Sequence, residues 1–313
     1  MSAGPRIAVV GATGAVGRVT LGLLRERGYT DVTAFASARS AGSTIDGLTI
    51  EEATPERLSS GAFDVCMFSV GTDASRELVP QTVASGALCV DKSSAFRLTE
   101  GIPLVVPEVN GERALEHQGI VANPNCCSIP LSIVLAPLRD AVGLARVRVS
   151  TYQSVSGAGA QALERLRAER PDDHDLKMDW SFDGVEFDEE SKIRAETRKI
   201  LELPDLPLSA TCVRAPIPVG HAEAVWIETE EAVSPEQAQG ILGAADGIQL
   251  EEFPSPAKAA GGDQVLVGRI RADTASENGL ALFLACDNLR KGAALNAIQI
   301  AELVAPAQAT AAR

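Results

Sequence analysis

The sequence predicts an α/β protein of two domains, and three observations support this fold class. Short apolar segments alternate with helical segments over the first third of the chain, which is typical of a doubly wound parallel sheet. Beyond Arg146 the strand-like segments are longer and few helices separate them, which indicates an α+β domain with a mixed sheet. The chain has 313 residues and 45% are hydrophobic, enough for two cores. We place the domains at 1–125 and 126–288, and we expect a final helical segment, 289–313, to complete the first domain.

The first domain contains four predicted strands and one helix with a clear period. The strands are short apolar segments bounded by glycine or polar residues: Ile7–Val10, Val32–Ala36, Phe63–Val70 and Ala87–Asp91. The helix, Val19–Arg27, turns Leu21, Leu23 and Leu24 toward the core. Strand and helix in this order predict parallel pairing with crossover helices.

The second domain is predicted from five further strands: Val147–Tyr152, Ser209–Arg214, Ala224–Glu230, Gln264–Arg271 and Leu280–Cys286. We interpret the highly charged segment Glu164–Glu190 as an exposed insertion. The last helix, Gly292–Val304, places Leu295, Ile298 and Ala301 on one face, so we expect it to return to the first domain.

Composition excludes several classes of function. The net charge of -14 argues against a nucleic-acid partner, because a phosphate backbone requires a basic surface. We find neither an apolar run of membrane-spanning length nor a signal-peptide pattern, so we expect no membrane association. The six cysteines are scattered, which favours reduced thiols and a cytoplasmic location. Their spacing and that of the histidines predict no metal site.

A glycine-rich loop indicates a dinucleotide site. Gly11-Ala12-Thr13-Gly14-Ala15-Val16-Gly17 directly follows the first strand and opens a helix. Glycines at such a turn let the backbone approach a pyrophosphate, which then lies at the helix N-terminus. Position in the first strand–helix unit predicts a Rossmann-type domain. The alternative is a tight turn that binds no ligand.

The end of the second strand discriminates between the two nicotinamide cofactors. An NAD site usually offers an acidic residue there for the ribose 2′-hydroxyl, and the segment Ala36–Gly42 contains none. Arg39 lies between Ser37 and Ser40, which suits a 2′-phosphate through charge-assisted and hydroxyl hydrogen bonds. We therefore favour NADP. The alternative for Arg39 is a solvated arginine in a surface turn.

Two adjacent cysteines stand at a predicted strand–helix junction. Cys126 and Cys127 follow Asn123-Pro124-Asn125 and precede an apolar helix, whose N–H groups and dipole would stabilise a thiolate and hold an oxyanion. Pro130 disfavours a regular turn that begins before Cys126, so we expect an irregular junction or a helix that begins nearer Ser128. Local chemistry does not choose between the two thiols, and a buried structural role remains the alternative for each.

Motifs along nearly the whole chain, in order, resemble the aspartate-β-semialdehyde dehydrogenase family. Besides the glycine loop and the segment Ala36–Gly42, they are Pro103–Asn110, Asn123–Cys126, Ser150–Gly159, Glu196–Ile200, Ser209–Arg214, Gly220–Glu223, Val267–Arg271 and Asp287–Glu302. The Asn-Pro-Asn-Cys block separates this family from related acylglutamyl-phosphate reductases, which usually carry a glycine before the cysteine.

The resemblance implies roles for the matching residues. Cys126 matches the nucleophile, His221 the general acid/base, and Gln153 the glutamine that orients the substrate. The positions that match cofactor contacts, together with those of the loop and of the second strand's end, are Gly11, Thr13, Gly14, Ala15, Val16, Ser37, Arg39, Ser40, Ser156, Gly157 and Asn288.

A second set of matches concerns the substrate. Arg214 matches the arginine that clamps an α-carboxylate, and Glu189 matches a substrate-binding glutamate. Lys192 and Arg97 match phosphate-binding residues, and Asn125 lies beside the nucleophile. From the residues alone, bland explanations compete: His221 and Arg214 as packing only, and Glu189 with Lys192 as a surface pair at i,i+3.

The function that the resemblance implies is reversible, NADP-dependent reduction of L-aspartyl 4-phosphate to L-aspartate 4-semialdehyde through a Cys126 thioester. It implies a small-molecule substrate, inorganic phosphate and a homodimer or homotetramer, in the biosynthesis of lysine, threonine, methionine and diaminopimelate. Two alternatives stay open: a reductase of a related acyl phosphate or acyl thioester, and a non-catalytic NADP-binding paralogue.

The chain departs from the family pattern at two places. Cys127 replaces a serine next to the nucleophile. The region between Gly159 and Glu189 is shorter than is typical, and Met178–Val185 stands where the family has an Ile-Pro-x-Ile-Asp-like motif. The exact substrate and the dimer geometry are therefore less defined than the type of reaction.

Overall fold

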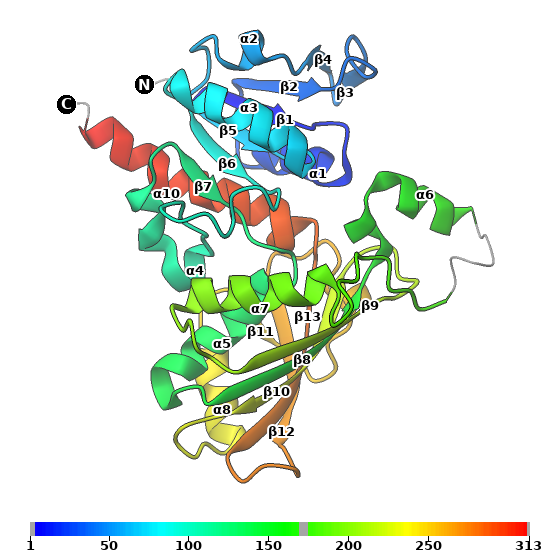
Figure 1. Ribbon diagram of the computed structural model, residues 1–313, viewed down its shortest axis with the longest axis vertical. Coiled ribbons are helices and arrows are strands. Elements are labelled where there is room, and N and C mark those ends of the chain that lie inside the picture. The colour runs from blue at the N-terminus through cyan, green and yellow to red at the C-terminus, as the bar shows by residue number, and fades with distance from the viewer. Residues whose placement is uncertain (1–3, 169–174, 312–313) are drawn as a thin grey trace. The chain divides into compact units, whose positions relative to one another are not determined.

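The computed structural model describes residues 4–168 and 175–311 (Figure 1). Contacts between residues divide the chain into two compact units. Unit 1 consists of Met1–Pro124 and Ala293–Arg313, and unit 2 of Asn125–Gly292. No helix within the described part of the chain has both the length and the apolar character needed to cross a membrane.

Unit 1 is built on a seven-stranded sheet in the order β3-β4-β2-β1-β5-β6-β7. Its strands are β1 Ile7–Val10, β2 Val32–Ala36, β3 Thr44–Ile45, β4 Leu48–Glu52, β5 Val65–Phe68, β6 Leu88–Asp91 and β7 Ile120–Ala122. All neighbours pair in parallel except β3 with β4, which confirms the predicted parallel sheet. β3 and β4 were not predicted, because they are short or polar, whereas β7 is the strand expected to end before the two cysteines.

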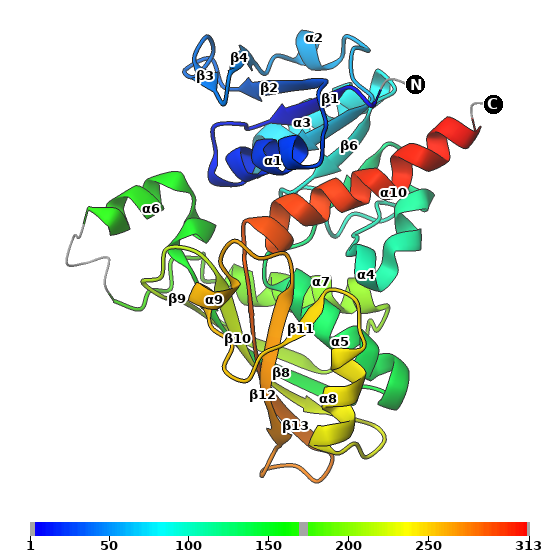
Figure 2. The ribbon, with the colours of Figure 1, turned by 180° about the vertical axis from the view of Figure 1, so that it is seen from behind.

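Helices cover both faces of this sheet, as alternate residues of β1 show. Ile7 and Val9 pack in one core with α1 (Ala15–Glu26) and α10 (Leu295–Ala311). Ala8 and Val10 pack in a second core with α2 (Pro55–Leu58) and α3 (Thr72–Ala84). Figure 2 shows α1 and α10 on the near side of the sheet. The doubly wound architecture is therefore confirmed.

The helices of unit 1 differ in detail from their predicted bounds. α1 begins four residues earlier than Val19, directly after the glycine loop. The last helix is preceded by one π-helical turn, Arg290–Ala294, and Ile298 and Ala301 are buried in the core of unit 1 as predicted. Two short helices, α4 (Pro107–Asn110) and the 3-10 helix η1 (Gly111–Glu116), pack against α10.

Unit 2 is built on a six-stranded mixed sheet in the order β11-β12-β13-β10-β8-β9. The strands are β8 Arg146–Gln153, β9 Leu208–Arg214, β10 His221–Glu228, β11 Ile248–Leu250, β12 Val265–Ala272 and β13 Gly279–Cys286. β8 pairs in parallel with β9 and β11 with β12, and the other pairs are antiparallel. The predicted mixed sheet is confirmed, and β11 is the one strand of this sheet that the sequence did not predict.

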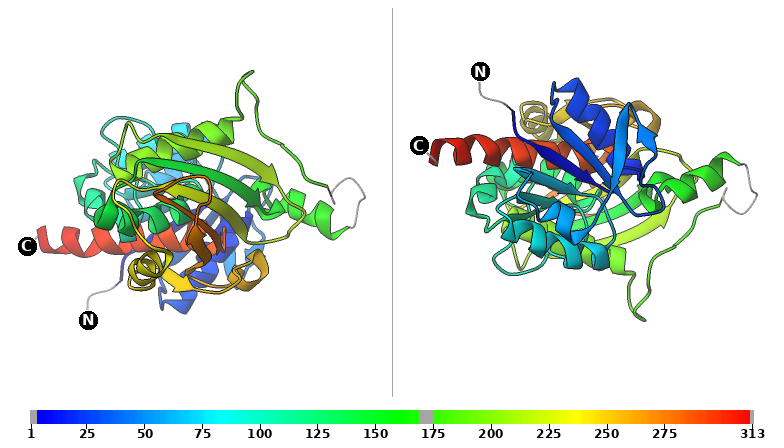
Figure 3. Two further views of the ribbon diagram at one scale, coloured as in Figure 1. Left: turned by 90° about the horizontal axis from the view of Figure 1, so that it is seen from below. Right: turned by 90° about the horizontal axis from the view of Figure 1, so that it is seen from above.

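Three helices of unit 2 lie against the sheet or one another: α5 (Ser128–Val142), α7 (Asp188–Leu201) and α8 (Pro235–Gly243). The 3-10 helix η2 (Val155–Ala158) leads into α6 (Ala160–Arg167), which projects from the rest of the unit (Figure 3). α9 (Pro256–Ala259) is a single turn.

The expectation of few helices in this domain is wrong. The expectation of an exposed insertion at Glu164–Glu190 is wrong at the C-terminal end of that segment. Residues 169–174 lie outside the described residues, and most of the described remainder is exposed. However, Glu189 and Glu190 are buried in the first turn of α7. Their charge suggested exposure, but hydrogen bonds to Asn125 and to Cys212 N–H hold them inside.

Candidate active site

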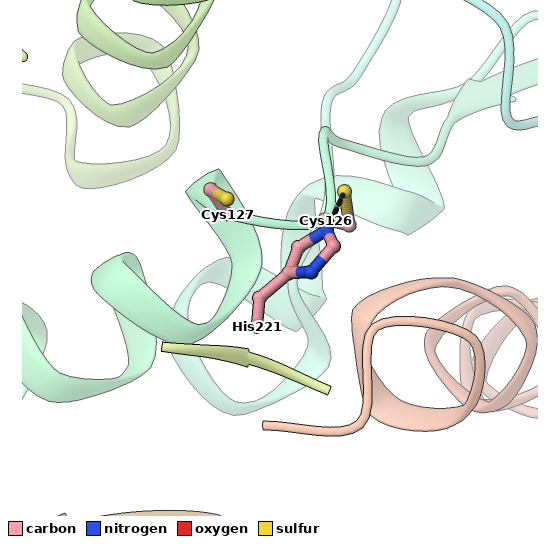
Figure 4. A group of neighbouring side chains, drawn as sticks. All are labelled: Cys126, Cys127 and His221. Atoms are coloured by element: carbon pink, nitrogen blue, oxygen red, sulfur yellow. Dashed lines mark hydrogen bonds between the residues drawn. The ribbon is translucent and has the colours of Figure 1, made fainter. Parts of the chain in front are cut away.

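The residue at the strand–helix junction that faces a base is Cys126. α5 begins at Ser128 with Cys127 as its N-cap, which confirms the expected late start before Pro130. Cys126 is half-buried, and its Sγ lies 3.2 Å from Nε2 of His221, the first residue of β10 (Figure 4). A thiol and an imidazole at this distance can share a hydrogen bond, which is the arrangement of a nucleophile and its proton-transfer partner. This contact argues against the alternative that His221 has only a packing role.

The other ring nitrogen of His221 determines where the ring carries its hydrogen. The N–H of Ser154 donates to Nδ1 at 2.9 Å. A neutral ring with an accepting Nδ1 carries its hydrogen on Nε2, so it presents an N–H to the Cys126 sulfur. Ser154 Oγ lies 3.1 Å from Nδ1 and donates to Asn288 Oδ1. Ser154 was not among the predicted site residues, because a main-chain contact does not depend on residue type.

Asn125 fixes the junction. Its side-chain oxygen accepts the Cys127 N–H at 2.8 Å, and its own N–H donates to Glu196 at 2.6 Å. The expected oxyanion site at the helix start therefore has fewer N–H donors, because the Cys127 N–H already donates to Asn125 and Pro130 has no N–H. Asn125 is placed beside the nucleophile, as predicted, and acts there on the backbone.

A buried carboxylate lies next to this junction. Glu189 Oε1 accepts hydrogen bonds from Asn125 Nδ2 at 2.9 Å and from Gln153 Nε2 at 3.1 Å. Burial raises the pKa of Glu189, and the nearby Cys126 adds to the increase, while the two amides oppose it. The surface-pair explanation for Glu189 with Lys192 is wrong, since Lys192 pairs with Asp188 at 2.7 Å, one helical turn away.

Arg214, at the end of β9, is buried and fully engaged on one side. Its Nη1 donates to Ser154 O at 3.1 Å and to Gln153 Oε1 at 3.4 Å. Arg214, Gln153, Glu189 and Asn125 thus form one chain of hydrogen bonds that leads to the nucleophile. A Cβ at Gly157 would lie 2.9 Å from Arg214 Nη1 and 3.2 Å from the His221 ring, so a larger residue there would displace the Arg214 guanidinium.

Cys127 is chemically different from its neighbour. It is completely buried, and burial raises the pKa of its thiol well above the usual value. Glu223, on β10, is also completely buried, and burial raises its pKa well above the ordinary range. No conventional hydrogen bond reaches either oxygen of Glu223 from the described residues, and the Cys127 thiol only partly opposes the increase. No motif or periodicity in the sequence indicates the burial of Glu223.

The glycine loop in unit 1 has the shape that a phosphate-binding turn requires. Gly11 has φ +91°, and a Cβ there would lie 2.4 Å from Ser69 O at the end of β5. A Cβ at Gly17 would lie 2.2 Å from Gly11 O. Gly14 is the N-cap of α1 and has no side chain to cover the first-turn N–H groups. The loop lies where the strand order reverses, between β1 and β5, which is the usual dinucleotide position.

The remaining predicted cofactor and phosphate residues are placed as follows. Ser37 and Arg39 are exposed in a turn directly after β2, where Ser40 N–H donates to Ser37 O at 2.8 Å. Arg97 is buried in unit 1 and its Nε donates to Asn123 O at 3.1 Å, so its phosphate role stays a prediction. Ser156 bonds to Asn288 in unit 2.

Comparison with known proteins defines the class of this chain. A family described as semialdehyde dehydrogenase, NAD binding domain, matches residues 6–117, and one described as semialdehyde dehydrogenase, dimerisation domain, matches residues 135–183 and 179–291. The glycine cradle at the switch point and the thiol–imidazole pair agree with a nicotinamide-dependent oxidoreductase that contains a dimerisation domain.

Individual relatives narrow the class further. Aspartate-semialdehyde dehydrogenase of Corynebacterium melassecola is 45% identical over 95% of this chain and 98% of its own, and that of Bacillus subtilis is 41% identical over 96% and 98%. The solved structure of aspartate semialdehyde dehydrogenase II from Vibrio cholerae, described as complexed with ASA, has a TM-score of 0.91 and 38% identity and covers 96% of this chain and 98% of its own. The chain belongs to the aspartate-semialdehyde dehydrogenase family.

Proposed function

We propose that the chain catalyses the reversible, NADP-dependent conversion of L-aspartate 4-semialdehyde and phosphate to L-aspartyl 4-phosphate. The observation that supports this most directly is the 3.2 Å contact between Cys126 Sγ and His221 Nε2. The neighbouring chain of hydrogen bonds contains Glu189 and Arg214, which offer a negative and a positive charge to the ammonium and carboxylate groups of an amino acid. The relatives of this family support the same substrate.

Cys126 and His221 can carry the covalent steps. The Cys126 thiol releases its proton to solvent, the sulfur anion adds to the aldehyde carbon, and the negative charge moves from sulfur to the carbonyl oxygen. The Nε2–H of His221 donates first to the sulfur and then to this oxygen, which sharpens the acid/base role implied by the family. The bound nicotinamide supplies the hydride acceptor. A phosphate oxygen then attacks the carbonyl carbon of the Cys126 thioester, the carbon–sulfur bond breaks, the proton of the phosphate leaves to solvent, and the sulfur anion returns to its place beside His221.

The charges of the site match a free amino acid. Arg214 offers a guanidinium edge to the α-carboxylate, which favours bidentate binding. Glu189 offers a carboxylate to the α-ammonium, and the amides of Asn125 and Gln153 keep one of its oxygens in place. We assign the phosphate to Lys192 and Arg97. The outcome in the cell would be a step of lysine, threonine, methionine and diaminopimelate synthesis.

The cofactor and the assembly follow from the rest of the chain. The exposed Arg39 between two serines, with no acidic residue at the end of β2, suits the 2′-phosphate of NADP. Ser37, Ser40, Ser156, Gly157 and Asn288 complete the proposed contacts with NADP and its nicotinamide. The dimerisation domain supports a homodimer or homotetramer. Six free cysteines suit the reducing cytoplasm.

The test is phosphate-dependent formation of NADPH from L-aspartate 4-semialdehyde, compared with NAD and with the N-acetylated aldehyde. We expect Cys126→Ala to lower kcat by at least about 1,000-fold, because the nucleophile is lost. The matched variant Cys127→Ala should keep most of the activity, since its thiol is buried and protonated. Mass mapping of the trapped acyl group should locate it on Cys126. A dead Cys127→Ala with an active Cys126→Ala, or equal rates with the N-acetylated aldehyde, would refute the proposal.

A further inference from the structure

Arg214 already binds a carboxylate of the protein itself, that of Asp179. Asp179 lies in the segment Met178–Val185, where this chain departs from its family. Asp179 Oδ1 accepts from Arg214 Nη2 at 3.1 Å, and both carboxylate oxygens lie 3.3 Å from Nε. The Trp180 ring covers the face of the guanidinium, with its centroid 4.5 Å from Cζ. The pair is asymmetric, because the Arg214 side chain is 7% exposed and that of Asp179 is 38% exposed.

Only one edge of this guanidinium can receive a bidentate carboxylate. Nη1 is bound to the backbone oxygen of Ser154 and to Gln153, which are themselves buried and fixed by the sheet. The edge formed by Nε and Nη2 is the one that Asp179 occupies. A substrate carboxylate that binds bidentately must therefore take the place of Asp179.

Asp179 lies in a short link between two backbone anchors. On one side, Lys177 and Arg214 exchange two backbone hydrogen bonds of 2.9 and 2.7 Å. On the other side, the N–H of Asp188 donates to Ser181 O at 2.9 Å. Three residues, 178–180, span the gap between these anchors. A small cavity beside the pair is lined by Asp179, Arg214 and the exposed Arg165, so a second cation is at hand when Asp179 leaves Arg214.

We propose that Asp179 is an internal ligand of the substrate-carboxylate site and that it sets the affinity of this enzyme for its substrate. The inference rests on the proposed function of Arg214 as the carboxylate clamp. In the free protein, Asp179 neutralises a buried cation that would otherwise stand unpaired. The substrate α-carboxylate exchanges for it, one negative charge for another, while Trp180 stays on the guanidinium face. The apparent dissociation constant is raised by the fraction of time that Asp179 occupies the edge.

This exchange also decides how strongly the site discriminates. An aldehyde without an α-carboxylate leaves Asp179 in place. Arg214 then stays paired, so binding of this aldehyde does not leave a buried charge without a partner. Removal of Asp179 should therefore strengthen binding of the carboxylate-bearing substrate and increase the preference for it. A residue that only held Arg214 in position would have the opposite effect on its removal.

The experiment compares Asp179→Asn with Asp183→Asn, which removes the same charge from the same segment but contacts backbone N–H groups of Val185 and Glu186. With full-length protein, NADP and phosphate, we expect Asp179→Asn to lower the KM for L-aspartate 4-semialdehyde by about 3- to 10-fold, as expected for a site whose competent state is about 10–30% populated. The KM for 3-aminopropanal, which lacks the carboxylate, should not change. Trp180→Ala should raise the KM for L-aspartate 4-semialdehyde, because Arg214 loses its support.

A binding measurement separates this inference from the proposed function. By calorimetry, Asp179→Asn should bind L-aspartate about 3- to 10-fold more tightly than wild type and bind β-alanine unchanged, whether or not the aldehyde turns over. If wild type does not convert L-aspartate 4-semialdehyde, the proposed function fails, and the calorimetry still decides the role of Asp179. An unchanged or weaker affinity for L-aspartate in Asp179→Asn, relative to Asp183→Asn, would overturn the inference.

Discussion

Burial separates Cys126 from Cys127 although they are neighbours in the chain. The turn at Asn125 places one thiol against the imidazole and the other in the core, where a thiolate would lack solvent. A one-residue difference in register thus decides which sulfur faces the imidazole. The residues alone predict the junction and its late helix start. The choice of thiol and the roles of the surrounding residues needed the family resemblance, because residue type is the same at both cysteine positions.

Both carboxyl oxygens of Glu223 are buried without a conventional hydrogen bond from the described residues. A carboxyl group with no conventional hydrogen bond, beside two thiols, is stable only in its neutral form. Glu223 lies two residues after His221 on β10, so the same strand carries the imidazole and a buried acid. A negative charge on Cys126 would raise the pKa of Glu223 further, since two adjacent negative charges oppose one another.

This state of Glu223 predicts how the stability depends on pH. The folded-state pKa lies above the ordinary value of 4.5, so as pH rises the unfolded chain ionises first. The contribution of Glu223 to the free energy of unfolding is therefore fully present below pH 4.5 and is lost as pH rises through the folded-state pKa. Glu223→Gln cannot ionise and should avoid this loss.

We expect Glu223→Gln to melt about 2–4 °C higher than wild type at pH 8, which corresponds to about 1 kcal/mol, with the difference closing toward pH 4.5. Calorimetric scans between these pH values would measure it. Glu252→Gln removes the same charge from an exposed position and should show no such trend. A lower melting temperature for Glu223→Gln at pH 8 would mean that the carboxylate form is the one that the fold requires.

At the scale of elements, the β1–loop–α1 unit depends on contacts that only glycine permits. Gly17 lies in the first turn of α1, and its Cα is so close to the Gly11 carbonyl that strand and helix pack without intervening side-chain atoms. This close approach positions the N-terminus of α1 for phosphate. Gly22, two residues before Leu24 in the same helix, faces open space.

The two glycines should therefore respond oppositely to alanine. A Cβ at Gly17 would lie 2.2 Å from Gly11 O and 2.8 Å from Ala12 Cα, so Gly17→Ala must displace backbone. We expect a loss of about 1–3 kcal/mol in the free energy of unfolding and at least about 10-fold weaker NADP binding. Gly22→Ala should leave NADP binding unchanged and raise the free energy of unfolding by up to about 1 kcal/mol. Urea titration and calorimetry with NADP test this; equal NADP affinity in both variants would show that the loop tolerates a shifted helix.

How well sequence predicts an element here depends on where its polar groups go. The apolar strands β1 and β2 and the glycine loop follow general patterns, so their bounds could be predicted closely. α7 could not, because Glu189, Glu190 and Glu196 are buried by specific hydrogen bonds that no periodicity reveals. The contact of Asp179 with Arg214 is likewise invisible in the sequence, since it joins a loop to the end of a distant strand.

At the scale of the whole molecule, the chain leaves unit 1 at Pro124 and returns to it at Ala293. α10 then supplies Leu295, Ile298 and Ala301 to the core that β1 and α1 also line. Unit 1 can therefore be completed only after unit 2 has been synthesised, although each unit has a sheet and a core of its own. Both tryptophans, Trp180 and Trp226, lie in unit 2, so their fluorescence reports that unit alone.

This distribution allows the stability of the two units to be measured separately. Ile298 is completely buried in the core of unit 1, and Ile298→Ala should remove about 2–5 kcal/mol from the stability of that unit. In urea, the loss of NADP binding should move to a lower midpoint, while the tryptophan transition of unit 2 keeps its wild-type midpoint. Leu303→Ala, on the same helix but 42% exposed, should shift neither midpoint appreciably. If Ile298→Ala instead shifts the tryptophan transition by the same amount, the two units unfold as one cooperative block, and the return of α10 then stabilises the whole chain rather than its first unit alone.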